Sequence, residues 1–212
     1  MEVSRQQFGP VEEVERGPRA RTRRLMLETA TRLMQRGVTP SVSEVAEAAG
    51  VSRATAYRYF PSQAALVHAV VGEALGPILT WKSGAASAEE RVAELFSTSL
   101  PRIDEFEATF KAALKLSLEQ WAQRQAGSLG NEPQFKRGHR VELLRHALAP
   151  LKGELTKAQI DRLAQALSLI FGVEVLIVLK DIWGLEAGKA QTVAQWAANT
   201  LVRAAISEAK SI

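Results

Sequence analysis

The segment from Ser41 to Tyr59 predicts two short helices that cross at close range. Ser41 can cap the first helix, and the Glu44 side chain can reach back to the cap amide, which is a capping box. Gly50 ends this helix, and Ser52 caps a second helix that runs to Tyr59. Small residues fall where the two helices would cross: Ala46, Gly50, Val51 and Ala56. Two helices joined by a glycine turn predict a helix-turn-helix unit.

Helical periodicity dominates the rest of the chain. Met26, Leu27, Ala30, Leu33 and Met34 form one apolar stripe, and Pro61 and Ser62 open a further helix. Beyond residue 76 we expect helices near 88–99, 101–126, 137–152, 156–183 and 188–209. Because no strand alternation persists anywhere, the predicted fold is all-α.

The chain of 212 residues is long enough for two units. Residues 1–18 read as a flexible N-terminal arm that ends at Gly17 and Pro18. Residues 19–71 hold the helix-turn-helix, and residues 72–212 form a second, helical domain.

Composition excludes several kinds of site. There is no cysteine, which rules out disulfides and thiolate chemistry, and the three histidines give no metal-ligand spacing. We expect neither a metal nor a cofactor. The longest apolar stretch, Leu167–Leu179, is too short for a membrane span and contains Glu174. No catalytic motif appears at mechanistic spacing, so an enzyme is not expected, and we predict a cytoplasmic protein without a membrane partner.

Positive charge is concentrated near the N-terminus. Residues 18–63 carry eight arginines against three carboxylates, a net charge of +5, whereas the whole chain has a net charge of only +4. This asymmetry indicates either a polyanion-binding surface or a solvated basic helix face. Charge by itself does not separate the two interpretations.

The second helix of the unit is rich in hydrogen-bond donors. Ser52, Arg53, Thr55, Tyr57, Arg58 and Tyr59 supply hydroxyl and guanidinium groups, and both tyrosines of the protein lie here. Such donors suit DNA phosphates, and an arginine can grip a guanine edge with two hydrogen bonds. The alternative is a short helix packed on a core with half-buried tyrosines.

The stretch from Gly37 to Val71 closely resembles the DNA-binding domain of the TetR family of bacterial regulators. The resemblance covers roughly residues 20–71 and includes the capped helices, the Gly50-Val51-Ser52 turn and the Tyr57-x-Tyr59-Phe60 motif. It implies that the first three helices bind operator DNA as a homodimer, and that the remaining helices bind a small-molecule effector.

The resemblance also assigns individual positions to DNA. In the helix that follows Ser52, the positions implied to face DNA are Arg53, Ala54, Thr55, Tyr57, Arg58 and Tyr59. In the helix that follows Ser41, Val42 and Ser43 are implied to approach it. Gln63 stands where the family commonly has a phosphate-contacting lysine, so an amide would have to donate there without charge. Ala56 replaces the usual leucine or isoleucine of the interior.

The predicted helix 156–183 is apolar on all sides and must therefore be covered on all sides. Beside it, the helix near 188–209 carries small residues that allow close approach. Together with the resemblance, this pattern predicts a dimeric four-helix interface, although a fully intrachain core is the alternative. The expected interface residues are Leu167, Ile170, Ile177, Val193, Ala194, Ala197 and Leu201.

Glu174 is a carboxylate among apolar residues, and it needs a partner or a proton. It is expected to pair with an arginine of the 137–145 segment, such as Arg140, or to contact a ligand. Aromatic residues could line an effector pocket, although aromatics at helical spacing are more often core. The candidate effector residues are Phe106, Phe110, Trp121, Arg140, Phe171, Glu174 and Trp183.

The function that these features favour is an effector-responsive transcriptional regulator, a repressor, that binds a palindromic operator as a homodimer. A nucleoid-type DNA-binding protein without a ligand is the first alternative, although a stronger and more dispersed basic surface would be expected of it. A helical enzyme is the remote alternative.

Overall fold

The computed structural model describes residues 17–131, 133–135 and 138–210. Within these ranges the fold is all-α, as predicted, and there is no β-strand. The helical elements are α1 Pro18–Gln35, α2 Val42–Ala48, α3 Arg53–Tyr59, α4 Gln63–Leu75, η1 Gly76–Thr80, α5 Ala88–Glu105, α6 Glu107–Gln125, α7 His139–Ala147, η2 Ala149–Leu151, α8 Lys157–Ser168, α9 Val173–Leu176, η3 Ile177–Ile182 and α10 Ala187–Lys210. Apart from Gly17 and Pro18, the predicted N-terminal arm lies outside the described residues.

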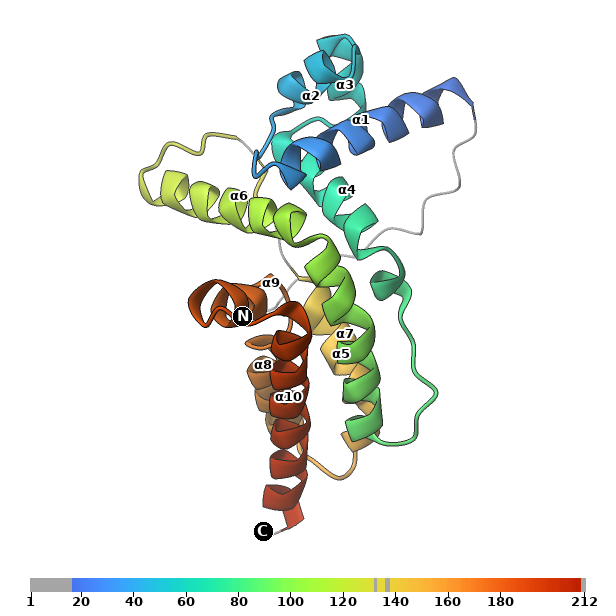
Figure 1. The fold of residues 1–212 in the computed structure, drawn as a ribbon, viewed down its shortest axis with the longest axis vertical. Coiled ribbons are helices and arrows are strands. Elements are labelled where there is room, and N and C mark those ends of the chain that lie inside the picture. Colours follow the sequence, from blue (N-terminus) through green and yellow to red (C-terminus); the bar gives the residue numbers. More distant parts are fainter. Residues whose placement is uncertain (1–16, 132, 136–137, 211–212) are drawn as a thin grey trace.

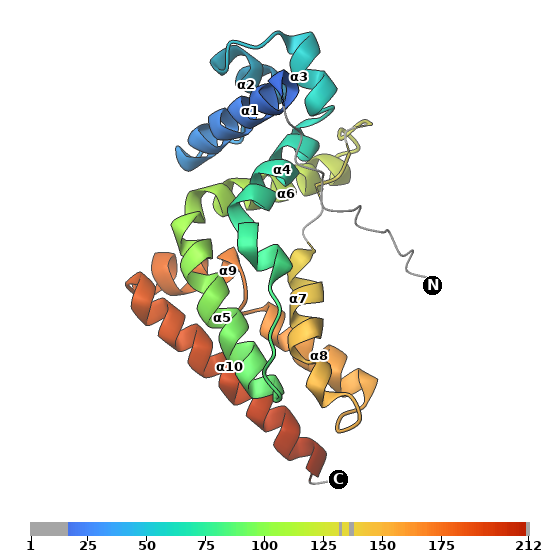
Figure 2. The ribbon, with the colours of Figure 1, turned by 90° about the vertical axis from the view of Figure 1, so that its right-hand side faces the viewer.

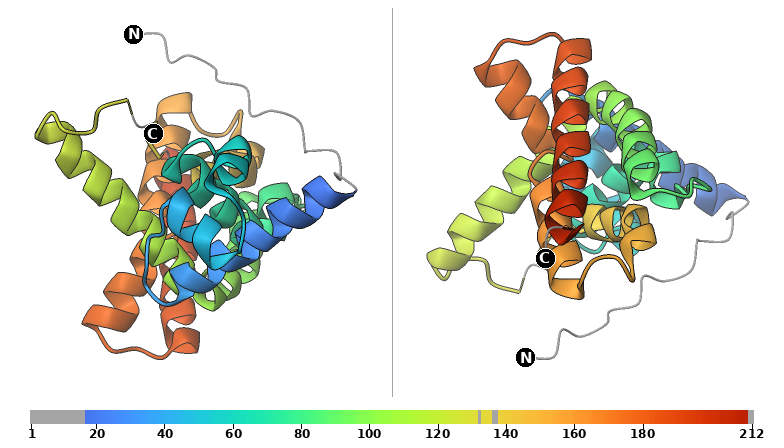
Figure 3. Two further views of the ribbon diagram at one scale, coloured as in Figure 1. Left: turned by 90° about the horizontal axis from the view of Figure 1, so that it is seen from above. Right: turned by 90° about the horizontal axis from the view of Figure 1, so that it is seen from below.

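Helices α1, α2 and α3 form a small unit at one end of an elongated molecule (Figures 1 and 2). The apolar stripe predicted for α1 is buried at Met26, Leu27, Ala30 and Met34. Seen from above, α1 and α6 project from the molecule in different directions (Figure 3).

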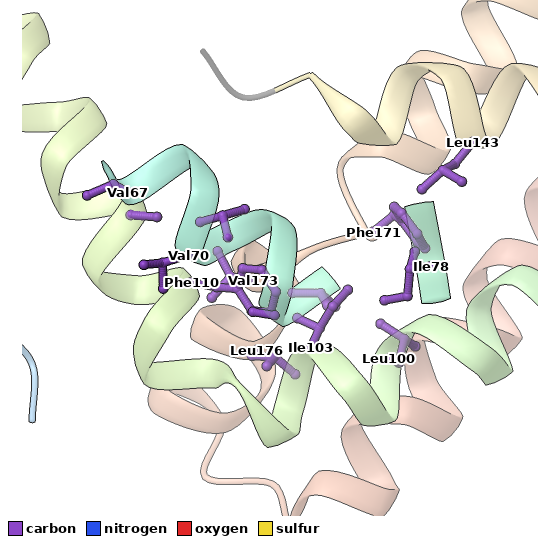
Figure 4. Packing of buried hydrophobic residues seen from close by; sticks show 14 of the residues in the cluster. Val67, Val70, Ile78, Leu100, Ile103, Phe110, Leu143, Phe171, Val173 and Leu176 are labelled. Carbon is purple, nitrogen blue, oxygen red and sulfur yellow. The ribbon is translucent and has the colours of Figure 1, made fainter. Parts of the chain in front are cut away.

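Helix α4 joins this unit to the rest of the chain. Six of its residues are buried: Ala64, Leu66, Val67, Val70, Val71 and Ala74. Val67 and Val70 continue into the same cluster as Phe110, Val173 and Leu176 (Figure 4). The two parts of the molecule therefore share one continuous hydrophobic core through α4. The stretch Gln63–Thr80 is apolar enough to cross a membrane by composition, but this shared core accounts for its apolar residues.

The C-terminal body is built on α5, α7, α8 and α10, with α10 packed along α5 and α8. Phe96 of α5 is fully buried, and its ring lies 5.1 Å from that of Phe171 between centroids. Helix α10 buries the small residues Ala190, Ala194 and Ala198. Their size allows close approach of α10 to its neighbours, as the sequence pattern indicated.

The single helix expected over 156–183 is wrong. The helix is interrupted between Ser168 and Val173, and the axes of the two helical pieces differ in direction by 49°. Gly172 has φ of 127°, which other residues rarely adopt, and a Cβ atom there would lie 2.7 Å from Nη2 of Arg140. Six apolar residues of the segment are buried within the chain, whereas four large ones are exposed: Leu169, Val178, Ile182 and Trp183.

Two other helix boundaries differ from the prediction. Helix α5 runs through Pro101 to Glu105 instead of ending at residue 99, and the break falls at Phe106, which ends α5 and begins α6. The predicted helix 137–152 is shorter, because α7 ends at Ala147 and a 3-10 turn follows.

An ion-pair cluster holds the α5–α6 joint against η3. Nζ of Lys180 lies 2.5 Å from Asp104 and 2.6 Å from Glu107, and Lys111 bridges Glu107 and Asp181 at 2.7 Å from each. Hydrogen bonds from Asp104 and Glu107 raise the pKa of Lys180. Burial alone would raise the pKa of Glu107, but the two ammonium groups hold it below its usual value. Lys180 and Glu107 therefore stabilise each other's charged forms, and the cluster ties these elements together.

Candidate nucleic-acid interface

The predicted capping box of α2 is present. Oγ of Ser41 accepts a hydrogen bond from the Glu44 amide at 3.2 Å, and the Ser41 amide donates to the Glu44 carboxylate at 2.7 Å. The hydrogen bond from the Ser41 backbone and that from its side chain lower the pKa of Glu44. The start of α2 is thus determined by two residues three positions apart.

The turn between α2 and α3 needs a glycine. Gly50 has φ of 65°, in the left-handed region, and the Val51 amide donates to the Ala46 carbonyl at 2.9 Å. Ser52 then caps α3, because its Oγ accepts from the Thr55 amide at 3.2 Å. This local chemistry makes a helix, a tight turn and a second helix.

Two alanines allow α2 and α3 to pack closely. Ala46 and Ala56 are fully buried, and each lies on the inward side of its helix. Since Ala56 is the only buried residue of α3, the rest of this short helix is available to solvent. The small side chain at position 56 therefore helps to bring α3 against its support while leaving an open outer face.

The outer face of α3 carries the predicted donors. Arg53, Ala54, Tyr57 and Arg58 are exposed, whereas Thr55 and Tyr59 are half-buried. Tyr57 is 46% exposed, and its hydroxyl lies 3.4 Å from Oγ of Ser43 on α2. The two helices thus present one joint surface of hydroxyl and guanidinium groups.

Three predicted contact residues have side chains that are buried or already hydrogen-bonded within the chain. Val42 is buried in the core, so its side chain is not on the surface. The Gln63 side-chain amide donates to the carbonyls of Thr39 and Pro40, at 3.0 and 3.2 Å, which occupies both of its hydrogens. Ser52 is exposed, but its hydroxyl donates to Oγ1 of Thr55 at 2.9 Å.

A second candidate site is a cavity of about 90 Å³ between α4, α5, α6 and α7. Of the predicted effector residues, Phe110, Arg140 and Phe171 line it. Trp121 and Trp183 do not, since they are 57% and 72% exposed on the surface, and Phe106 is not among the lining residues either. Sequence reasoning missed the lining residues that α4, η1 and the segment before α7 supply, which include His68, Leu75, Ile78 and Phe135.

The predicted pairing of Glu174 with Arg140 is confirmed, at 2.7 Å. Glu174 is not in the middle of a helix, however, but in the first turn of α9. The Arg140 guanidinium also donates to the Ser168 carbonyl at 3.1 Å, so it bridges the break between α8 and α9. Of this pair only Arg140 lines the cavity, and Glu174 is not among the lining residues.

Two imidazoles meet at the cavity wall. The ring of His68, on α4, lies 5.6 Å from that of His139, on α7. Burial and the neighbouring His68 lower the pKa of His139, so this imidazole is neutral at pH 7. The polar groups of the cavity lie mainly at this α7 end, and the rest of the lining is apolar.

The predicted interface residues divide into two groups. Leu167 and Ala194 are buried inside the chain and are not on its surface. Val193 is exposed, and Ile170, Ile177, Ala197 and Leu201 are half-buried. Two large apolar residues that were not predicted are far more exposed: Leu169, at 77%, and Trp196, at 65%.

Residues 26–70 match the sequence profile of the bacterial regulatory proteins of the tetR family. Over these residues the chain is similar to the tetR family. The HTH-type transcriptional repressor LfrR of Mycolicibacterium smegmatis is 39% identical over 57 residues, which cover 27% of this chain and 30% of that repressor. The match therefore spans under a third of this curated relative.

A solved structure has a similar overall fold. A crystal structure of a TetR transcriptional regulator from Rhodococcus sp. RHA1 superposes with a TM-score of 0.52 over 86% of this chain and 96% of that chain. The two sequences are 19% identical, so the match concerns the fold alone.

The charge of Glu44 contributes to stability in a pH-dependent way. Because its pKa is lowered on folding, the stabilisation is present above the unfolded pKa near 4.5 and is lost as the pH falls through the folded value. Glu44→Gln retains a capping side chain without the charge. We expect urea denaturation to show the wild type as more stable than Glu44→Gln at pH 7, with the difference shrinking as the pH falls below 4.5. A difference that stays constant with pH would contradict this assignment.

Proposed function

We propose that this chain is a transcriptional repressor that binds operator DNA as a homodimer and is released by a small-molecule effector. The observation that carries the proposal is the outer face of α3, where Arg53, Tyr57 and Arg58 are exposed on a helix capped at Ser52. A helix with such a face fits the major groove of DNA. DNA-bound regulation also agrees with the predicted location in the cytoplasm.

The roles of the exposed donors differ. Arg53 stands at the first position of α3, and in helix-turn-helix units the N-terminal part of the second helix reaches the base edges. Tyr57 lies one turn later and meets Ser43 of α2, which suits a shared phosphate contact. We therefore assign Arg53 to base recognition and Tyr57 to positioning on the backbone.

Selection from a random DNA library is expected to enrich a pseudo-palindrome. Arg53→Ala should lose about 1–3 kcal/mol of binding free energy on the enriched operator. On random DNA the same variant should lose much less. Tyr57→Phe should weaken binding to both by a similar factor. Fluorescence anisotropy measures the six affinities of the wild type and the two variants for the two DNAs. Equal losses on both DNAs for Arg53→Ala would show that it touches only the backbone, and failure to enrich any sequence would favour nucleoid-type binding.

The dimer is argued from the apolar surface of the C-terminal body. Leu169 and Trp196 are strongly exposed, and Val193 and Ala197 lie on the same helix as Trp196. Helices α8 and α10 pack on each other, so their outer faces form one surface. A two-fold partner would bury these residues and place two α3 helices at a spacing set by the pair.

Replacing Val193 by aspartate should disrupt the dimer, because a charge would be buried without a partner. Light scattering at micromolar concentration is expected to give twice the chain mass for the wild type and the chain mass for Val193→Asp. The matched control is Val141→Asp, an equally exposed valine on α7. A monomeric wild type, or a control that dissociates as readily, would rule out this interface.

The effector site is proposed to be the cavity. Val71 and Leu75 of α4 line it together with Ile78 of η1, so a molecule there touches the helix that follows α3. The Arg102 guanidinium donates to the carbonyls of Glu73 and Leu75, both at 3.2 Å, and holds the end of α4 on α5. A cavity of 90 Å³ is small for a ligand, so a bound effector must enlarge the cavity and shift α4. The lining suits an apolar effector with one polar group near His139 and Arg140.

Filling the cavity should remove the response to effectors without abolishing operator binding. Ala113 lines the cavity from α6, and Ala113→Leu places three more carbons there at a stability cost of about 1–3 kcal/mol. The control is Ala122→Leu, an exposed position on the same helix. Operator binding is titrated with apolar and amphipathic compounds. If Ala113→Leu keeps the full response to a compound that releases the wild type, the effector site lies elsewhere.

A further inference from the structure

The first two turns of α1 carry arginines and take no part in the core. Four arginines lie within six residues: Arg19, Arg21, Arg23 and Arg24. The buried residues of α1 begin only at Met26. Eight residues of helix, about 12 Å in length, therefore precede the part that packs. Hydrophobic burial does not explain why this segment is helical.

Electrostatics opposes a helix with this composition. Cations near a helix N-terminus are unfavourable because the amides there carry a partial positive charge, and the first turn of α1 contains no acid. Arg19 and Arg23 are four residues apart, and Arg21 and Arg24 are three apart, so like charges also face each other. Among the described residues, no carboxylate pairs with Arg19, Arg21 or Arg24. A bound polyanion would offset both effects.

The position of these arginines indicates which polyanion. The Arg23 guanidinium lies 5.9 Å from the ring centre of Phe60, which directly follows the last residue of α3. Figures 1 and 2 show the N-terminal end of α1 at the same end of the molecule as α2 and α3. The basic turns of α1 therefore continue the candidate DNA surface beyond the C-terminal end of α3.

Helix α4 adds no lysine or arginine to this flank, where Arg58 in the last turn of α3 is exposed. Helix α4 starts here, but its first residue is the neutral Gln63, whose amide hydrogens are held by Thr39 and Pro40. Nucleic-acid phosphates alongside α3 would meet no cation from α4. The arginines of α1 can supply that charge.

We propose that Arg19, Arg21 and Arg24 bind the DNA phosphates that flank the base pairs contacted by α3, with Arg23 positioning this part of α1 against Phe60. The inference rests on the proposed DNA-binding function and adds a second contact surface to it. Arginine suits this role because its planar group makes two hydrogen bonds to a phosphate. Phosphate contacts carry no sequence information, so these arginines would strengthen binding to any duplex.

The salt dependence of binding tests the proposal. Each phosphate contact contributes about 0.9 to the slope of log affinity against log salt, so replacing three contacts should lower the slope by about 2–3. We compare the wild type with the triple variant Arg19→Gln, Arg21→Gln, Arg24→Gln on a fluorescent 30-base-pair duplex of random sequence. The control triple variant Arg36→Gln, Arg124→Gln, Arg203→Gln removes the same charge from exposed positions elsewhere and should keep the wild-type slope.

A second measurement locates the contacts. When the selected operator is extended by one helical turn on each side, the wild type should gain affinity and the α1 variant should gain much less. Circular dichroism and urea denaturation verify that both triple variants fold. Unchanged slopes for the α1 variant, or an equal fall for the control variant, would overturn the inference.

The outcomes separate this inference from the function on which it rests. A wild type that prefers its operator, combined with an α1 variant of unchanged slope, refutes only the role of the arginines. A wild type that binds random duplexes with a steep salt dependence but prefers no sequence refutes operator recognition. In that case a smaller salt dependence of the α1 variant would still support the phosphate contacts. A wild type that binds no DNA refutes both.

Discussion

The packing of α4 is the constraint on which the rest of the structure depends. It packs on α1 of the helix-turn-helix unit and on α5 and α6 of the C-terminal body, and its buried residues belong to the one core cluster that both parts share. Protein interiors are densely packed, so a helix shared between two units cannot move without changing contacts on both sides. Its start, capped by Ser62, follows α3 by only a few residues, and its end reaches the cavity at Leu75. One helix thus links the candidate DNA surface to the candidate effector site.

Arginine and lysine side chains bind the helix ends and joints of the C-terminal body. Arg140 bridges Ser168 and Glu174 across the bend before α9, and Arg102 binds the last carbonyls of α4 while lying over Phe106, 4.8 Å from its ring centre. Lys180 joins the α5–α6 joint to η3. Charged hydrogen bonds are directional, so each can fix the angle between two helices better than apolar contact does. Arg140 and Leu75, which belong to two of these joints, also line the cavity.

The helix-turn-helix was predictable because its signals are local. The capping box of Ser41 and Glu44, the positive φ of Gly50 and the cap at Ser52 act over three or four residues, and each was found where the sequence indicates it. The pairing of Glu174 with Arg140 was also predictable, since a carboxylate among apolar residues needs a partner. The donors of α3 were placed on one helix by periodicity, and Arg53, Tyr57 and Arg58 are exposed there.

The sequence by itself therefore determined the all-α class, the α2–α3 unit and the chemistry of its outer face, because caps, turns and periodicity act between neighbours in the chain. Only the tertiary structure decided that the segment 156–183 bends at Gly172, where the Arg140 side chain from α7 occupies the space of a Cβ atom. It also decided that Gln63 turns inward to Thr39 and Pro40, and that α4 contributes His68 and Leu75 to the cavity. These features depend on contacts between residues far apart in the chain, which no local pattern records.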